Sequence, residues 1–325
     1  MTEVRDAAAD QRVRSISVVV AVYNAARSLR TLVDRLERSL TAIGVPFEVI
    51  LVNDGSRDES WQVVQELAAR RPWLLGIDLS RNFGQHNALL CGIRAARHAA
   101  VVTMDDDLQN PPEEIPKLIE RLSTGCDVVY GSPEQPQHGF WRDLASHATK
   151  LVLGGALGAA TARQVCGFRI FRTRLRDAFD DYSGPSVNLD VLLTWATTRF
   201  DAIKLRHEPR QYGQSNYTFG KLVAHAVNML TGFSTLPLQI ASILGFVLTA
   251  LGLMLFAVVI ARYLIHGVIV PGFTFLASVI VIFSGAQLFT LGVIGEYLAR
   301  MHFRIMRQPS YSIRQAVGVR ETSPA

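Results

Sequence analysis

The stretch AVVTMDDDLQNPP at residues 100–112 joins a short apolar run to three consecutive aspartates. Its first five residues are apolar or β-branched, which is typical of a buried strand, and the two prolines favour the start of a helix. Ligands of α/β sheets bind beyond the carboxyl ends of the strands. This stretch therefore predicts a strand followed by a functional loop.

The same alternation of apolar runs and helical periodicity extends on both sides of this stretch. We expect strands at residues 16–22, 47–52, 74–79, 100–104 and 127–130, and helices near residues 29–40, 60–70, 87–96 and 113–122. Strands that alternate with helices predict an α/β fold whose mostly parallel sheet is covered by helices on both faces.

The aspartate run suggests a metal site. On an extended segment, residues two apart project to the same side, so Asp105, Asp107 and Gln109 would converge while Asp106 points elsewhere. Their carboxylate and amide oxygens suit a hard divalent cation, Mg²⁺ or Mn²⁺, shared with a diphosphate. An acidic loop that precedes a helix explains the same residues without a metal.

Two other strands end in polar residues. Asp54 follows the strand at 47–52, and its carboxylate could accept a hydrogen bond from a pyrimidine ring, although a turn before a helix explains it equally well. Tyr23 and Asn24 follow the strand at 16–22 and could pack against a base and its ribose. Because these strands belong to one sheet, we expect their ends to share one edge.

Two long stretches, residues 240–261 and 272–295, contain no charged residue. As helices each would be about 33–36 Å long, which exceeds a hydrocarbon core of about 30 Å. They predict a hairpin of two transmembrane helices, at about residues 238–264 and 272–296. The alternative is a pair of helices buried in a protein core.

The tail at residues 299–325 is basic, and it contributes +4 to the formal net charge of +5. The positive-inside rule then predicts a protein of the cytoplasmic membrane whose tail and N-terminal region both face the cytoplasm. Its charge suits a membrane surface rather than nucleic acid. No apolar run precedes Ile16, so we expect no cleaved signal peptide, and the three cysteines fit a reducing compartment.

Several segments together resemble the family 2 glycosyltransferases of GT-A fold, in the branch that acts on polyprenyl phosphate. They are SVVVAVYN (17–24), VNDGSRD (52–58), RNFGQHNAL (81–89), MDDDLQNPPEEIP (104–116), CGFR (166–169), YGQSNYTFGKL (212–222) and GAQLFTLGVIGEYLAR (285–300). The resemblance covers about residues 15–315. It implies a GT-A nucleotide-sugar-binding domain followed by a two-helix transmembrane hairpin.

With this resemblance, the sequence divides into parts of different character. The expected parts are a disordered lead-in at residues 1–14, the catalytic domain at 15–218, an interfacial helix at 219–236, the two transmembrane helices within 237–298 and a basic cytoplasmic tail at 299–325. The family also implies a homo-oligomer, a tetramer.

The resemblance implies an inverting, metal-dependent transfer of a sugar from a nucleotide diphosphate, with a UDP-sugar the family's usual donor, to polyprenyl (undecaprenyl) phosphate. The implied site residues are Ala21, Tyr23, Asn24, Asp54, Gly84, Gln85 and Asp106 at the nucleotide, Asp105, Asp107 and Gln109 at the metal, and Arg142, Ser146 and Arg210 at the acceptor phosphate. Asp105, Asp107 and Arg210 would carry the catalysis. The sequence does not name the sugar.

Four positions depart from the family pattern. Ala25 stands where a glutamate is frequent, Pro133 where an arginine is common, Arg163 where an aspartate is common, and Asn216 in place of a lysine. These departures affect the predicted sugar and acceptor contacts more than the metal ligands.

Two other functions fit parts of the sequence. A processive polysaccharide synthase would share the nucleotide-binding half, but it needs a Gln-x-x-Arg-Trp segment that none of the four tryptophans provides. An inactive, membrane-docked partner subunit would explain the departures. Binding of Mn²⁺ and a nucleotide would distinguish that partner from an enzyme.

Overall fold

The computed structural model describes residues 12–133, 165–184, 187–209, 236–266, 273–306 and 308–318. Most of the expected lead-in and of the expected interfacial helix lies outside these ranges, and so do Arg142, Ser146 and Arg210. The chain divides into two compact units, one of Met1–Leu222 with Arg307–Ala325 and one of Val223–Met306. Each unit is described by itself below.

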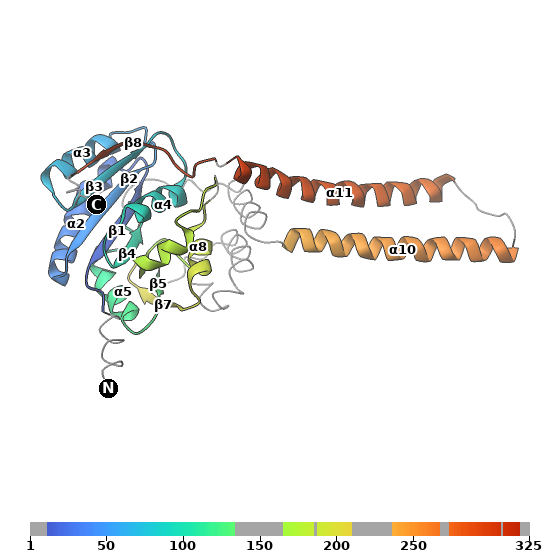
Figure 1. Ribbon diagram of the computed structural model, residues 1–325, viewed down its shortest axis with the longest axis horizontal. Coiled ribbons are helices and arrows are strands. Elements are labelled where there is room, and N and C mark those ends of the chain that lie inside the picture. The colour runs from blue at the N-terminus through green and yellow to red at the C-terminus, as the bar shows by residue number, and fades with distance from the viewer. Residues whose placement is uncertain are drawn as a thin grey trace. The chain divides into compact units, whose positions relative to one another are not determined.

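The first unit contains an eight-stranded sheet in the order β7-β5-β6-β4-β1-β2-β3-β8 (Figure 1). The strands are β1 Ile16–Val22, β2 Phe47–Asn53, β3 Leu74–Leu79, β4 Ala100–Met104, β5 Val128–Pro133, β6 Arg169–Arg172, β7 Phe200–Leu205 and β8 Ile313–Val317. Strands β4, β1, β2 and β3 are parallel neighbours, and β5 is parallel to β7. β6 and β8 run antiparallel to their neighbours. The predicted mostly parallel sheet is confirmed.

Helices cover both faces of this sheet, as predicted. The helices are α2 Ala26–Ile43, α3 Ser60–Arg70, α4 Gln85–Ala95, the short η1 Pro112–Glu114, α5 Ile115–Leu122, η2 Thr173–Phe179 and α8 Leu189–Ala196. One core joins α2, α3 and α5 to side chains such as Val18 and Val20 of β1. The other joins α4, η2 and α8 to side chains such as Val19. Alternate residues of a strand thus face opposite cores, each buried side chain contributing about 1.5–3 kcal/mol.

The second unit contains two long apolar helices, α10 Leu236–His266 and α11 Phe273–Ile305, which pack against each other. Gly252 allows a close approach, since a Cβ there would lie 2.9 Å from the ring of Phe283. Both helices expose large apolar side chains; Phe246 is 78% exposed and Leu288 69%. Among the described residues, these two helices are long and apolar enough to cross a membrane. Such exposure is unfavourable in water and suits a lipid environment.

The chain after α11 returns to the first unit, where β8 forms the edge strand beside β3. Arg314 lies 3.3 Å from Asp78 and donates to the carbonyl of Ser80 at 2.6 Å. Ser310 is buried and exchanges hydrogen bonds with the backbone of Gly184. Part of the expected basic tail is therefore integral to the sheet.

Candidate active site

Three loops meet at the carboxyl edge of the sheet because β4, β1 and β2 are parallel neighbours. The backbone N–H of Tyr23, after β1, donates to the Asp106 carboxylate, after β4, at 3.0 Å. Asn24 bonds to the loop after β2: its N–H donates to Ser56 Oγ, and its side-chain oxygen accepts from the Arg57 N–H at 2.8 Å. The expectation that these strand ends share one edge is confirmed.

Asn24 is held in an uncommon backbone conformation, with a φ of 53°. Asparagine tolerates this left-handed region better than most residues. Its side chain thus links two loops of the edge. Ala25, where the family often has a glutamate, is buried, and its N–H donates to Ser60 Oγ at 2.8 Å.

Asp54, just after β2, organises a fourth loop at residues 81–84, which follows β3. Its carboxylate is buried and accepts hydrogen bonds from the N–H groups of Phe83 at 2.7 Å and Gly84 at 2.9 Å. Burial raises the pKa of the Asp54 carboxyl, while these two hydrogen bonds oppose the rise. Each carboxylate oxygen has a further lone pair, so the arrangement leaves acceptor capacity for a ligand. The predicted nucleotide contact of Asp54 remains a prediction.

Gly55 allows this loop to approach so closely. It has a φ of 63°, and a Cβ there would lie 2.5 Å from the backbone nitrogen of Asn82. A larger residue would push the loop at residues 81–84 away from Asp54. The turn between β2 and α3 therefore requires glycine for two independent reasons.

The aspartate run is not extended, contrary to the premise of the sequence argument. Residues 106–108 form a bend, in which Leu108 has a φ of 61° and is fully buried. Asp107 accepts a hydrogen bond from the Gln109 N–H at 3.1 Å, closing a local turn. A left-handed leucine costs roughly 1–3 kcal/mol, which is typical of a constrained functional loop.

Asp105 is enclosed by two segments from elsewhere in the sequence. Gln85, the first residue of α4, donates from its side chain to the Asp105 carboxylate at 2.5 Å. On the other side, a Cβ on Gly167 would lie 3.0 Å from the same carboxylate. Thr103 fixes Gly167 by donating to its carbonyl at 2.8 Å. Sequence reasoning missed Gly167 and Thr103, although the CGFR segment was a signal for the glycine.

Negative charge is concentrated in this loop. Burial, together with the charges of Asp105 and Asp107, raises the pKa of the Asp106 carboxyl to about 7, against the hydrogen bond from Tyr23. A bound cation would relieve this repulsion.

Asp105, Asp107 and Gln109 all offer oxygen ligands, so these residues fit Mg²⁺ or Mn²⁺. Within the described part of the chain no group of three or more His, Cys, Asp or Glu side chains could hold a metal. Further oxygens would have to come from water or substrate.

A buried ion pair supports the CGFR segment from behind. Arg169 pairs with Asp190 at the start of α8, and Tyr130 of β5 donates to the same carboxylate at 3.0 Å. All three side chains are buried. Since removing one partner of a buried pair typically costs about 3–5 kcal/mol, this network fixes β6, and with it Gly167, against α8.

A second network holds residues 206–209 beside the aspartate loop. Arg35 of α2 forms hydrogen bonds to both Glu113 and Glu208 at 2.7–3.1 Å. The Glu208 N–H donates to the carbonyl of Gln109 at 2.8 Å. The segment that precedes Arg210 therefore lies against the loop of the predicted metal ligands.

A family model described as glycosyl transferase family 2 matches residues 17–183. The chain belongs to this family and is a glycosyltransferase. It is 34% identical over 314 residues to the undecaprenyl-phosphate 4-deoxy-4-formamido-L-arabinose transferase of Proteus mirabilis, covering 96% of both chains. The protein with the same name from Pectobacterium atrosepticum is 34% identical over 308 residues, 94% of both chains.

Solved structures share the fold at lower identity. Mannosyl-3-phosphoglycerate synthase of Rubrobacter xylanophilus has a TM-score of 0.53 at 15% identity, over 69% of this chain and 76% of that one. Glucosyl-3-phosphoglycerate synthase of Mycobacterium tuberculosis, in complex with Mn²⁺ and UDP-glucose, has a TM-score of 0.52 at 18% identity, over 70% and 80%. The predicted GT-A fold is confirmed.

Proposed function

We propose that the protein transfers a sugar from a nucleotide diphosphate, a UDP-sugar in our expectation, to polyprenyl phosphate. The observation that carries the proposal is similarity over nearly the whole chain to curated relatives that are named for transfer to undecaprenyl phosphate. The two candidate membrane helices add support, because a polyprenyl acceptor resides in the membrane.

The donor would bind at the carboxyl edge, where the loops after β1, β2 and β4 meet. Tyr23, Asn24 and Asp54, with Ala21, Gly84, Gln85 and Asp106, would surround the nucleotide. The hydrogen bonds between these loops support this assignment, since they hold the loops in one preformed arrangement.

Asp105, Asp107 and Gln109 would hold a Mg²⁺ or Mn²⁺ ion at the diphosphate. Support comes from their oxygen ligands, from the concentrated negative charge, and from a fold relative crystallised with Mn²⁺ and UDP-glucose. When bound, the ion would supply positive charge that stabilises the leaving diphosphate. Gln85 and Gly167 position Asp105 for this task.

The acceptor would react directly. An oxygen of the polyprenyl phosphate forms a bond to the anomeric carbon as the bond from that carbon to the nucleotide diphosphate breaks, with inversion. The attacking phosphate is already anionic, so the step requires no proton transfer to a base. Arg142, Ser146 and Arg210 would bind this phosphate through charge-assisted hydrogen bonds. The position of residues 206–209 beside Gln109 supports the role of Arg210.

We further infer the topology. Strand β8 follows α11 in sequence and pairs with β3, so the catalytic domain and residues 313–317 would lie on the same side of the membrane. By the positive-inside rule, the basic residues after α11 favour the cytoplasm for that side. Single cysteines introduced at residues 5 and 320 should be protected from a membrane-impermeant reagent in intact cells, and one at residue 266 should react. Labelling at either terminus would contradict the hairpin.

The function is tested by incubating the full-length protein with labelled nucleotide sugars, Mn²⁺ and undecaprenyl phosphate, with undecaprenol as the matched control. We expect one nucleotide sugar to label the phosphorylated lipid and none to label undecaprenol. If a full panel of nucleotide sugars labels neither lipid while UDP binds normally, the proposed acceptor is wrong.

A further inference from the structure

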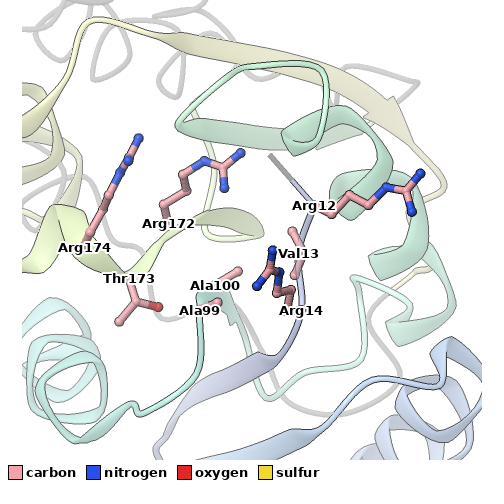
Figure 2. Close-up of a pocket in the computed structure, with 8 residues that line it drawn as sticks. All are labelled: Arg12, Val13, Arg14, Ala99, Ala100, Arg172, Thr173 and Arg174. Carbon is pink, nitrogen blue, oxygen red and sulfur yellow. The ribbon is translucent and has the colours of Figure 1, made fainter. Parts of the chain in front are cut away.

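A second polar region lies at the opposite, amino edge of the same sheet. A cavity of about 270 Å³ is lined there by four arginines: Arg12 and Arg14 before β1, Arg172 at the end of β6, and Arg174 just after it. Figure 2 shows the first pair on one side of the pocket and the second pair on the other. We call this cavity the arginine pocket.

The antiparallel course of β6 creates the pocket. It pairs Arg172 with Ala100, the first residue of β4, and so brings the end of β6 to the start of the parallel strands. Thr173 then donates to the carbonyls of Ala99 at 3.0 Å and His98 at 2.5 Å. These bonds fix the pocket floor, so the arginines are presented on a rigid base.

Arginines outnumber carboxylates among the described side chains at the pocket. Arg174 lies 3.1 Å from the carboxylate of Asp127, and Arg172 and Arg199 contact the same group at 3.7 and 3.3 Å. One carboxylate cannot neutralise three guanidinium groups, and Arg12 and Arg14 add two more charges. A concave surface of one charge sign concentrates oppositely charged ligands.

We propose that the arginine pocket binds a phosphate-bearing ligand. Guanidinium groups form paired hydrogen bonds with phosphate oxygens, and several converging arginines suit a group of multiple charge. Cavities that enclose drug-sized ligands have about 300–1,000 Å³, so 270 Å³ suits one or two phosphate groups rather than a whole nucleotide sugar. The phosphate could belong to a free phosphate compound or to the headgroup of an anionic lipid.

This site is separate from the proposed donor site. It lies at the other ends of β1 and β4, and it contains arginines where the donor edge contains aspartates. A ligand should therefore bind to the arginine pocket even when no divalent metal is present and no sugar transfer takes place.

The test uses the full-length protein in an uncharged detergent with EDTA and isothermal titration calorimetry. One titrant is inorganic pyrophosphate, and the other is dihexanoyl phosphatidic acid, with dihexanoyl phosphatidylcholine as its control. The test variant is Arg12→Gln/Arg14→Gln, since both side chains are exposed and precede the first strand. The matched control, Arg38→Gln/Arg70→Gln, removes two exposed arginines from α2 and α3.

We expect at least one titrant to bind the parent and the control with equal affinity. Its affinity for Arg12→Gln/Arg14→Gln should be lower by about tenfold or more, because two charge-assisted contacts are lost. Arg174→Gln, on the other side of the pocket, should weaken the same titrant. Loss with pyrophosphate alone assigns a free phosphate compound, and loss with phosphatidic acid assigns a lipid headgroup. If neither titrant distinguishes the test variant from its control, the proposal is overturned.

Discussion

The two edges of this sheet have opposite charge. At the carboxyl edge, Asp54 and the run Asp105–Asp107 follow parallel strands, and backbone N–H groups hold three of these carboxylates in place. At the amino edge, four arginines surround the arginine pocket. The same strands thus present a site suited to a cation with its diphosphate at one end and a site suited to a phosphate group at the other.

The difference shows how each site is built. The acidic edge takes its main residues from the positions directly after strands, so each short motif already contains its functional residue. The arginine pocket joins residues 12–14, 99–100 and 172–174, and only the antiparallel β6 brings them together. If the comparison is right, substitutions at the acidic edge should affect transfer, and those at the basic edge should not.

The largest effect is expected from Asp107→Asn. The amide can still accept the hydrogen bond from Gln109, so the turn is retained while one negative charge is lost. Removing a group that stabilises charge in the transition state typically costs about 100- to 1,000-fold in rate, and we expect a loss of at least that size in transfer. The matched control is Asp177→Asn, an exposed aspartate of η2. Equal transfer by both variants would remove Asp107 from the metal site.

A smaller effect is expected from Asp54→Asn. Phe83 and Gly84 donate to different carboxylate oxygens, and asparagine has an NH₂ group in place of one of them, so one partly buried N–H loses its partner. This should cost about 1–3 kcal/mol of unfolding free energy and weaken UDP binding roughly tenfold. Denaturant unfolding and calorimetry measure the two effects, with the exposed Asp34→Asn as the control. Unchanged stability and UDP affinity would mean that Asp54 does not organise this loop.

The smallest effect is expected from Asp127→Asn, which removes the carboxylate shared by Arg172, Arg174 and Arg199. The Arg174 side chain is 58% exposed, and ion pairs of such exposed groups contribute about 0.2–1 kcal/mol, so freeing it should tighten phosphate binding at the arginine pocket by roughly two- to fivefold. Titration with the ligand identified for the parent measures the change, and transfer activity should stay at the parent's level. Weaker binding would show that Asp127 arranges the arginines rather than competing for them.

The sequence predicted the parallel half of the fold well. The bounds of β1 agree with the expected strand, because seven residues rich in valine and isoleucine admit no helical periodicity. The strands β6, β7 and β8 were not predicted. β6 reads RIFR, four residues with an arginine at each end, and β8 reads IRQAV on an exposed edge. Neither has the apolar run that marks a buried parallel strand.

The candidate site was predicted in its members but not in its geometry. Residue alternation assumed an extended aspartate run, whereas the left-handed Leu108 turns the chain after Asp105. Contacts such as Gln85 with Asp105, or Glu208 with Gln109, join segments far apart in sequence and leave no periodic pattern. Only the packed structure shows them.

The most direct test measures where the nucleotide binds. UDP with Mn²⁺ is titrated into the full-length protein, into Asp107→Asn and into Arg12→Gln/Arg14→Gln, with thermal unfolding to confirm that each variant is folded. The acidic edge should bind the donor, so Asp107→Asn should lose most of the affinity while the arginine variant keeps that of the parent. The reverse result, normal binding to Asp107→Asn and lost binding to Arg12→Gln/Arg14→Gln, would contradict the assignment of the two edges.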